Sequence, residues 1–322
     1  MIKVLSIDGG GIRGIIPAIL LAEIEKRTGK PISNLFHLIA GTSTGGILAL
    51  GLVKPDKYAR PQYSARQLID FYEQEGSKIF SRTLWHRISS LDSLIAEKYT
   101  SKGVEEVLKK YFDNITISKA LTDIIITSYE TERRIPWFFK SRDMKKFKKG
   151  NQDFLMWQVA RATSAAPTYF QPTKVDINLD KGLYSFVDGG MFSSNPAMCA
   201  YSEAASIYGS GAEYMVVSLG TGEYTRPLLY KNIKKWGLAK WAQPILGVVF
   251  DGVNDTVDYQ LRQLLSPLNG VQRYYRFQTR LDIANDDMDD SSPKNISSLK
   301  ILAKCLIKEN HQLIDELCKK LT

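Results

Sequence analysis

The chain has 322 residues, of which 44% are hydrophobic and 24% are charged. These proportions are ordinary for a folded globular protein and exclude a disordered or low-complexity chain. Lys and Arg outnumber Asp and Glu by 43 to 34, and the resulting net charge of +9 favours anionic partners such as nucleic acid, phospholipid surfaces or acidic metabolites.

The cysteines and the N-terminal stretch indicate the cellular compartment in which the protein works. Cys199, Cys305 and Cys318 are odd in number and lack metal-site spacing, so we expect reduced thiols and neither disulfides nor zinc. The stretch MIKVLSIDGGG lacks the basic region and apolar run of a signal peptide, and no segment approaches the ~20 apolar residues that span a bilayer. These features predict a cytoplasmic protein with only peripheral membrane contacts, and they leave open secretion without a signal peptide.

Strand-like and helix-like segments alternate at the start of the chain. Residues 2–7 predict a buried strand, residues 15 to about 27 a helix, residues 35–41 a strand and residues 45–53 a helix. This βαβα order predicts an α/β fold of three layers, α/β/α, with a mainly parallel central sheet. Ligands of such sheets bind beyond the carboxyl ends of the strands.

The remaining segments extend the same pattern. Residues 64–112 predict helices inserted over the sheet, residues 153–166 a helix, and the chain beyond Gly222 mostly helix. Further strands are predicted at 122–130, 135–141, 183–190 and 212–222. We find no internal repeat or linker-like tract, so we expect one domain, 1–322, with a motif-bearing core at about 1–222 and a helical C-terminal portion at about 223–322.

A Gly-rich turn, SIDGGGIRG at 6–14, leaves the first strand and enters a helix. Glycine lets backbone N–H groups approach a ligand closely, and the helix N-terminus adds positive potential, so the turn suits an anion or an oxyanion. Gly9, Gly11 and Gly14 also satisfy G-x-G-x-x-G, which leaves a nucleotide-binding module open. Dinucleotide binding needs an acidic residue after the second strand, where this chain has the turn around Ser43.

The stretch HLIAGTSTGGILAL, residues 37–50, carries Ser43 between a strand and a helix. Gly41, Ser43 and Gly45 fit G-x-S-x-G, in which a serine on a sharp turn exposes its hydroxyl above a sheet. This pattern predicts a nucleophilic serine, and the alternative is a serine that only caps the following helix.

The base that would activate such a serine is usually a histidine, and the chain has only His37, His86 and His311. His37 lies within the strand that leads to Ser43, too near in sequence to fold back onto it. Only His311 follows in the Ser, acid, His order of α/β-hydrolases. It lies in an amphipathic helical pattern, where a solvent-facing side chain is the usual outcome.

An acidic candidate comes from FVDGGMFSSNP, residues 186–196. An apolar strand places Asp188 at its carboxyl end, and Gly189 and Gly190 allow an unusual backbone path. Asn195 and Pro196 are typical of an N-cap and first position of a helix. The alternative for Asp188 is a turn residue that bonds only to local backbone.

Four motifs together resemble the patatin-like phospholipase family: DGGGIRG at 8–14, GTSTGG at 41–46, RATSAAPTYFQP at 161–172 and DGG at 188–190. They occur in that family's order. The resemblance implies a patatin-like fold and a lipid acyl hydrolase of phospholipase A type. It also implies a Ser-Asp dyad that works without histidine, metal or cofactor.

Carried onto this sequence, the resemblance makes Ser43 the nucleophile and Asp188 the base that takes its proton. It implies that small residues of ATSAAP pack against the helix after Ser43. This chain has Ser194 where the family often has a second asparagine before Asn-Pro.

The resemblance also assigns the Gly-rich turn. The N–H groups of Gly10 and Gly11, together with Gly9, would form the oxyanion hole. Arg13 would bind lipid phosphate, as a substrate-binding residue, or fix the loop.

Alternatives to this function stay open at the level of sequence. They are a general lipase or thioesterase with the same dyad, a non-enzymatic nucleotide-binding module and a catalytically idle interaction protein. The expected partner is a phospholipid or other acyl lipid at a membrane surface, with an activating ligand or protein left unspecified. We expect no nucleic-acid partner, because no nucleic-acid-binding motif is present.

Three further segments have open interpretations. Residues 137–150 interleave aromatic residues with six Lys and Arg, which suits either membrane docking or a hairpin whose rings lie in the core. Residues 233–253 combine Trp and Lys with an apolar tail and predict either a surface-seeking helix or a core helix. The acidic residues 282–290 lack EF-hand spacing, so we expect an exposed loop.

Overall fold

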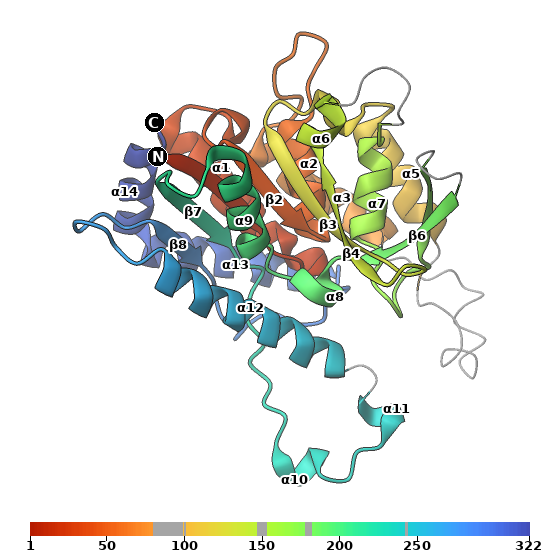
Figure 1. Cartoon of the computed structure of the whole chain (residues 1–322). Helices are drawn as coiled ribbons and strands as arrows, with labels where there is room; N and C mark the ends of the chain where they lie inside the picture. Colours follow the sequence, from red (N-terminus) through yellow and green to blue (C-terminus); the bar gives the residue numbers. More distant parts are fainter. Residues whose placement is uncertain (80–98, 100, 147–152, 178–181, 242–243) are drawn as a thin grey trace.

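The first strand shows why the sheet is buried on both faces. In β1 (Ile2–Ile7) the side chains of Leu5 and Ile7 pack into one apolar cluster, and Val4 packs into a second cluster on the opposite face. Alternation of this kind, with both faces apolar, is typical of a sheet covered by helices on each side. The computed structural model, which describes residues 1–79, 99, 101–146, 153–177, 182–241 and 244–322, has this arrangement (Figure 1).

The strands form one eight-stranded sheet in the order β5-β6-β3-β2-β1-β7-β8, with β4 paired to β3. Besides β1, they are β2 (Leu38–Thr42), β3 (Asp123–Glu130), β4 (Ile135–Lys140), β5 (Thr173–Ile177), β6 (Gly182–Asp188), β7 (Tyr214–Leu219) and β8 (Tyr274–Phe277). Strands β3, β2, β1, β7 and β8 are parallel, whereas β4, β5 and β6 join by antiparallel pairing. The sheet is therefore mainly parallel around β1, as predicted.

Helices cover both faces. On one side lie α1 (Ile15–Thr28), α2 (Thr44–Val53), α3 (Ala65–Ile79), α5 (Ser101–Phe112), α7 (Met156–Thr163), α13 (Pro293–Glu309) and α14 (His311–Leu321), and on the other lie α9 (Ala197–Tyr208) and α12 (Pro244–Leu264). The shorter helices are α6 (Ser141–Lys146), α8 (Gly190–Ser193), α10 (Tyr230–Ile233) and α11 (Leu238–Trp241), with 3-10 turns at Gly11–Gly14, Ile32–Asn34 and Ile117–Lys119. The three-layer α/β/α fold is thus confirmed.

Most predicted elements are present, and the differences have local causes. The strand expected from residue 35 begins at Leu38, because a 3-10 turn occupies Ile32–Asn34. The helix expected at 153–166 spans only Met156–Thr163, since the small residues beyond it form turns. The chain beyond Gly222 is mostly helical, as predicted, but it also contains the strand β8, which is only four residues long and was not predicted. We also did not predict β5, whose polar and apolar residues are mixed.

The structure bears on two membrane-related expectations, the absence of a spanning helix and the role of the aromatic segment 137–150. No helix within the described part of the chain is long and apolar enough to cross a bilayer. In β4, the Phe139 side chain is buried, and the Trp137 ring lies 5.4 Å from that of Tyr184, so the first aromatic residues of 137–150 belong to the core. Residues 147–150 of that segment lie outside the described residues.

The turn after β2 depends on close contact between backbones. A Cβ atom at Gly45, in the first turn of α2, would lie 2.2 Å from the carbonyl oxygen of Ile7, and one at Gly41 would lie 2.3 Å from the carbonyl oxygen of Gly45. Real Cβ atoms essentially never approach other heavy atoms this closely, and backbone cannot rotate away as a side chain can. Only glycine at these positions lets α2 start directly above β1.

We therefore expect Gly45→Ala to lower the free energy of unfolding by about 2 kcal/mol or more, since overpacking a rigid site costs roughly 1–3 kcal/mol. Gly211→Ala is the matched control, because nothing lies within 4 Å of a Cβ at that glycine. Its effect should stay within about 0.5 kcal/mol. Urea denaturation of the two variants checks this, and equal stabilities would contradict the close-contact explanation.

Candidate active site

Ser43 occupies the sharp turn that the sequence predicts. It lies between the last residue of β2 and the first of α2, with φ 54° and ψ −124°, a backbone conformation that is strained for any residue with a side chain. Its N–H donates to Oγ1 of Thr163 at 2.8 Å. Its side chain does not bond back to the helix as an N-cap would, so the capping alternative fails.

Strand register brings Asp188 to the same edge of the sheet. Thr42 pairs with Thr127 across β2 and β3, and Ser128 pairs with Asp188 across β3 and β6. Because β6 runs antiparallel to β3, it enters from beyond the carboxyl end of β3 and ends level with Ser128. Asp188 therefore reaches the serine turn although its strand runs against the parallel strands.

The Asp188 carboxyl group is buried beside Ser43. It lies beside Ser43, whose hydroxyl lowers its pKa, and it accepts the N–H of Gly190 on Oδ1 at 2.7 Å. Burial has the larger effect and raises the pKa of Asp188 to about 7. The local Asx-type bond and the position beside Ser43 thus coexist, so the two interpretations of this aspartate are not exclusive.

Gly189 serves a purpose other than the expected one. Its backbone is ordinary, with φ −64° and ψ −17°, so no unusual path is needed. A Cβ at Gly189 would instead lie 2.2 Å from Oγ1 of Thr127. The glycine is therefore required for the close approach of the Asp188 turn to β3.

The ATSAAP segment connects the two turns. Thr163 accepts the N–H of Ser43, and the carbonyl of Ala165 accepts the N–H of Asp188 at 3.0 Å. A Cβ at Gly46, in α2, would lie 2.8 Å from Cγ2 of Thr163, so α7 packs tightly on α2. The segment fixes the distance between Ser43 and Asp188, beyond the small-residue packing that the sequence predicts.

The Gly-rich loop lies beside Ser43. A Cβ at Gly9 would lie 3.3 Å from that of Ser43, and the Gly9 N–H already donates to the carbonyl of Ser194 at 2.8 Å. The N–H groups of Gly10 and Gly11 have no acceptor among the described residues. Two backbone donors next to the serine are thus available to an oxyanion, and Gly9 contributes by holding the loop.

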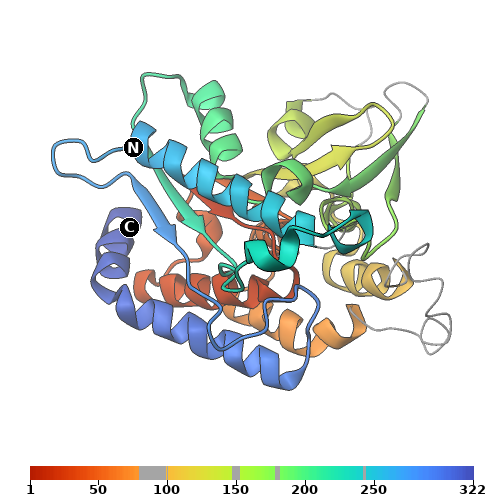
Figure 2. The same ribbon diagram turned by 90° about the horizontal axis from the view of Figure 1, so that it is seen from below.

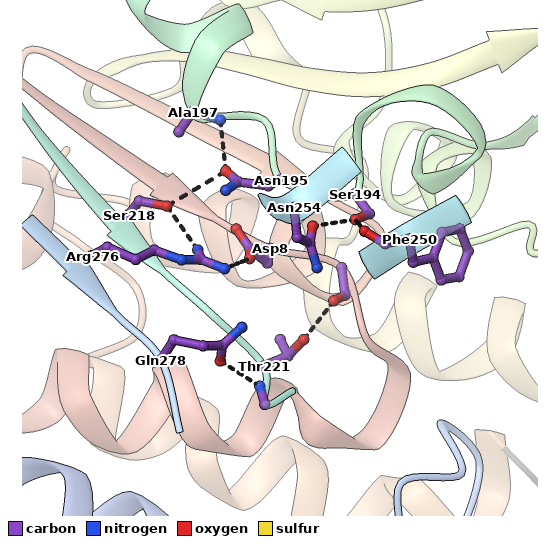
Figure 3. A network of polar contacts seen from close by, with 12 residues as sticks. Asp8, Ser194, Asn195, Ala197, Ser218, Thr221, Phe250, Asn254, Arg276 and Gln278 are labelled. Carbon is purple, nitrogen blue, oxygen red and sulfur yellow. Dashed lines mark hydrogen bonds and ion pairs between the residues drawn. The ribbon is translucent and has the colours of Figure 1, made fainter. Parts of the chain in front are cut away.

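A buried polar network supports this loop from the far side (Figure 3). Thr221 donates its hydroxyl to the carbonyl of Gly9 at 2.6 Å. Asp8, directly before Gly9, forms an ion pair with Arg276 of β8 at 2.7 Å, and Arg276 donates to Ser218 of β7 at 2.8 Å. Burial raises the pKa of Asp8 to about 6, with Arg276 opposing that change. Sequence reasoning did not identify Arg276, because no motif surrounds it.

Ser194 links the loop to α12. Its carbonyl accepts the N–H of Gly9, and its hydroxyl donates to the carbonyl of Phe250 at 3.3 Å and to the side chain of Asn254 (Figure 3). Asn195 accepts the N–H of Ala197 at 3.1 Å, but the N-cap position of α9 is Pro196, so the helix begins one residue later than predicted.

Arg13 is buried beneath the loop. Its Nε donates to the carbonyl of Gly10 at 3.1 Å, and its guanidinium lies 4.8 Å from the centre of the Tyr224 ring. Of the two roles that the resemblance suggested, this position favours fixing the loop over contacting a lipid phosphate.

The two described histidines lie away from Ser43. The side chain of His311 is 64% exposed and pairs with Asp315 at 3.2 Å. His37 accepts the N–H of Lys3 at 3.0 Å, at the opposite end of β2 from the serine. His86 lies outside the described residues.

An apolar cavity opens onto Ser43 and Asp188. Its walls combine the Gly-rich loop with side chains from distant segments, chiefly Ile12, Ile47, Phe71, Tyr72, Ile79, Val104, Tyr169, Phe170, Phe250 and Met288. Met288 also accepts the N–H of Ile12 on its carbonyl at 2.8 Å. The acidic segment 282–290 is therefore part of the cavity wall, and the expectation of a merely exposed loop was wrong for Met288 and for buried Asp286.

The surroundings of the Gly-rich loop argue against the nucleotide-binding alternative. A Cβ at Gly11 would lie 2.1 Å from the carbonyl oxygen of Met288, so protein backbone occupies the approach that a pyrophosphate would need there. Within the described residues, no group of three or more His, Cys, Asp and Glu side chains is placed to hold a metal ion.

Known proteins resemble this chain along most of its length. The family model described as patatin-like phospholipase matches residues 5–201. Patatin-like protein 2 of Oryza sativa subsp. indica is 31% identical over 352 residues, covering 98% of this chain and 86% of that protein. Patatin-like protein 4 of Arabidopsis thaliana is 30% identical and covers 96% and 84%, respectively. A Solanum tuberosum relative, 30% identical over 99% of the chain and 91% of its own length, is described as a probable inactive patatin.

Among solved structures, human GIVD cytosolic phospholipase A2 aligns with 99% of this chain and 60% of its own, at 9% identity and a TM-score of 0.45. The family model spans more than half of the chain, and the curated relatives align along nearly all of it. The chain belongs to the patatin-like phospholipase family.

Proposed function

We propose that the protein is a lipid acyl hydrolase of phospholipase A type that works through a Ser43 acyl-enzyme, with Asp188 as its base. The observation that carries this proposal is the buried Asp188 carboxyl group, placed beside a serine on a strained turn inside an apolar cavity. Membership of the patatin-like phospholipase family supports lipid as the substrate class.

In the first half of the reaction, Asp188 takes the Ser43 proton while Oγ attacks the ester carbonyl. A carboxylate with an ordinary pKa is a poor base for a hydroxyl, and burial reduces this mismatch by raising the pKa of Asp188 to about 7. The proton then passes to the departing alcohol or lysolipid, which leaves an ester on Ser43. Water activated by Asp188 attacks this ester, releasing the fatty acid and regenerating the serine.

The N–H groups of Gly10 and Gly11 would stabilise the negative charge that develops on the carbonyl oxygen. Preorganised donors of this kind contribute roughly 10²–10³ each to the rate in other hydrolases. Arg13 would keep them in place through the Gly10 carbonyl, and the Asp8–Arg276 pair would do so from behind. We regard these as positioning residues, because neither reaches the cavity.

The apolar walls of the cavity suit a fatty acyl chain better than a polar acyl group. A general lipase or thioesterase with the same dyad would use the same chemistry, so substrate tests must include thioesters and neutral lipids. We further propose that the protein acts from the cytoplasm at the surface of a membrane, because phospholipid substrates assemble in membranes.

Incubation with a fluorophosphonate probe and with phospholipid vesicles tests the dyad. We expect labelling and fatty acid release by the wild type, and losses of at least about 10³-fold in Ser43→Ala and Asp188→Asn. His311→Ala is the matched control and should keep full activity, because its exposed side chain is paired with Asp315. A wild type that is neither labelled nor active would refute the proposal that the protein is a serine hydrolase. An inactive His311→Ala would refute a dyad that works without histidine.

The rate should depend on pH through Asp188, which accepts a proton only when ionised. Because the pKa of Asp188 is about 7, we expect kcat/KM on a soluble ester to rise with pH and to level off above about pH 7. His86→Ala and His311→Ala should have the same profile, which separates Asp188 from a titrating imidazole. A rate that is already constant from pH 5 upward would show that the base has an ordinary carboxyl pKa.

Burial of Asp188 should also affect stability. The unfolded pKa is near 3.8 and the folded pKa is about 7, so the fold binds the extra proton between these values and loses stability as pH rises through that window. We therefore expect Asp188→Asn to be more stable than the wild type at pH 8, with the difference vanishing near pH 4. Asp176→Asn, at an exposed position of β5, is the control in urea denaturation. A wild-type advantage at pH 8 would contradict the proposed burial cost.

A further inference from the structure

The segment from Tyr224 to Phe250 has an unusual charge pattern. It contains five Lys and Arg residues and no Asp or Glu. Arg226 pairs with Asp286, but the four lysines, Lys231, Lys234, Lys235 and Lys240, are exposed and form no ion pair with described residues. The positive charge of these four lysines is therefore not neutralised by an ion pair within the described part of the protein.

The same segment exposes large apolar side chains. Leu228, Leu229 and Tyr230 are 40%, 43% and 77% exposed, and Ile245, Val248 and Val249 at the start of α12 are 47%, 47% and 37% exposed. Isolated exposed apolar residues are common on protein surfaces, but a contiguous group usually marks a binding surface. Here six of them fall in two groups, at 228–230 and 245–249, within 22 residues of sequence that also carry the four lysines without ion-pair partners.

The arrangement of the segment suits contact with a broad surface. Helices α10 and α11 extend away from the body of the protein and lie on the same side as α12 (Figures 1 and 2). The rings of Trp236 and Trp241 contact each other at 5.4 Å, and α11 packs against α12. The contact between Trp236 and Trp241 thus links the stretch after α10 to the end of α11, and the lysines and Tyr230 of this region are exposed.

This surface adjoins the cavity that contains Ser43. Phe250, one residue after exposed Val249, lines that cavity, and its carbonyl accepts a hydrogen bond from Ser194. The carboxylates of α12, which include Asp251 and Asp255, line a separate polar cavity with Arg262 and Arg276. The apolar and basic side chains are therefore not offset by the acidic residues of the same helix.

We infer that residues 226–241 and 244–250 form a docking surface for a bilayer of anionic phospholipids. Lysines attract the headgroups, while Leu, Val, Tyr and Trp side chains suit the interfacial zone below them. A small acidic ligand would not need the apolar residues, and an apolar protein partner would not need the lysines. The biological purpose of this surface, delivery of substrate to Ser43, rests on the function proposed above.

Binding is measured by co-sedimentation with vesicles in the Ser43→Ala background, so that hydrolysis cannot alter the lipid. We expect tighter binding to vesicles of phosphatidylcholine with 30% phosphatidylglycerol than to phosphatidylcholine alone, weakening as salt is added. The variant Lys231→Glu/Lys234→Glu/Lys235→Glu should bind anionic vesicles at least about tenfold more weakly. Leu229→Ser/Tyr230→Ser should weaken binding severalfold, by removing the apolar contribution.

The matched control is Lys294→Glu/Lys304→Glu/Lys308→Glu on α13, which covers the opposite face of the sheet. This variant changes the net charge by the same amount as the docking variant. Its three lysines are also exposed, and none of them forms an ion pair with a described residue. It should bind vesicles like the parent protein. Equal losses in the two triple variants would mean that only net charge matters, and would overturn the docking surface.

Two further measurements separate this inference from its alternatives. With Ser43 intact, the docking variants should hydrolyse a soluble short-chain ester normally and lose only hydrolysis of vesicles. If the docking variants lost hydrolysis of both the soluble ester and the vesicles, the substitutions would have damaged the active site and the proposal would fail. If the protein bound vesicles but hydrolysed nothing, the proposed enzymatic function would be refuted and the docking surface would still be supported. A dimer in sedimentation velocity that the docking variants abolish, or RNA binding lost in the same variants, would assign the surface to another partner and overturn the proposal.

Discussion

The contact between two backbones, where α2 begins above β1, is the constraint on which the site depends. Because Gly45 leaves no Cβ, the first turn of α2 touches the carbonyl of Ile7, and Ser43 must then adopt a left-handed backbone to connect β2 to this helix. The same contact sets the Gly-rich loop, which follows β1 directly, against the serine. One steric requirement therefore positions both the candidate nucleophile and the candidate oxyanion donors.

Asp188 illustrates how the fold stabilises a group that is unfavourable where it lies. A buried carboxylate opposes folding, and the surrounding contacts must offset that cost. The offset comes from the backbone bond to Ala165, the close approach of Gly189 to β3 and the hydroxyl chain through Thr42 and Thr127. The result is a carboxyl group whose pKa is raised to about 7, close to neutral pH.

The C-terminal portion does more than cover the sheet. It supplies Arg276 to the ion pair behind the Gly-rich loop, Met288 to the wall of the cavity and Phe250 to the same cavity from α12. The first 222 residues carry the recognisable motifs, but the enclosure of the site is completed by residues beyond them. Motif-based reasoning underestimates such residues, because a single side chain or carbonyl at a wall carries no local pattern.

The sequence alone determined the local geometry of this protein. Gly-x-Ser-x-Gly and the Gly-rich stretch 6–14 predicted tight backbone turns, and the structure has positive φ angles at Ser43, Gly10 and Gly11, since glycine spacing reports directly on such turns. Only the tertiary structure decided which groups meet. The antiparallel entry of β6, which brings Asp188 beside Ser43 from 145 residues further along the chain, is a matter of strand register. The pairing of Asp8 with Arg276 likewise depends on burial of both side chains, and neither register nor burial is encoded in any short stretch of residues.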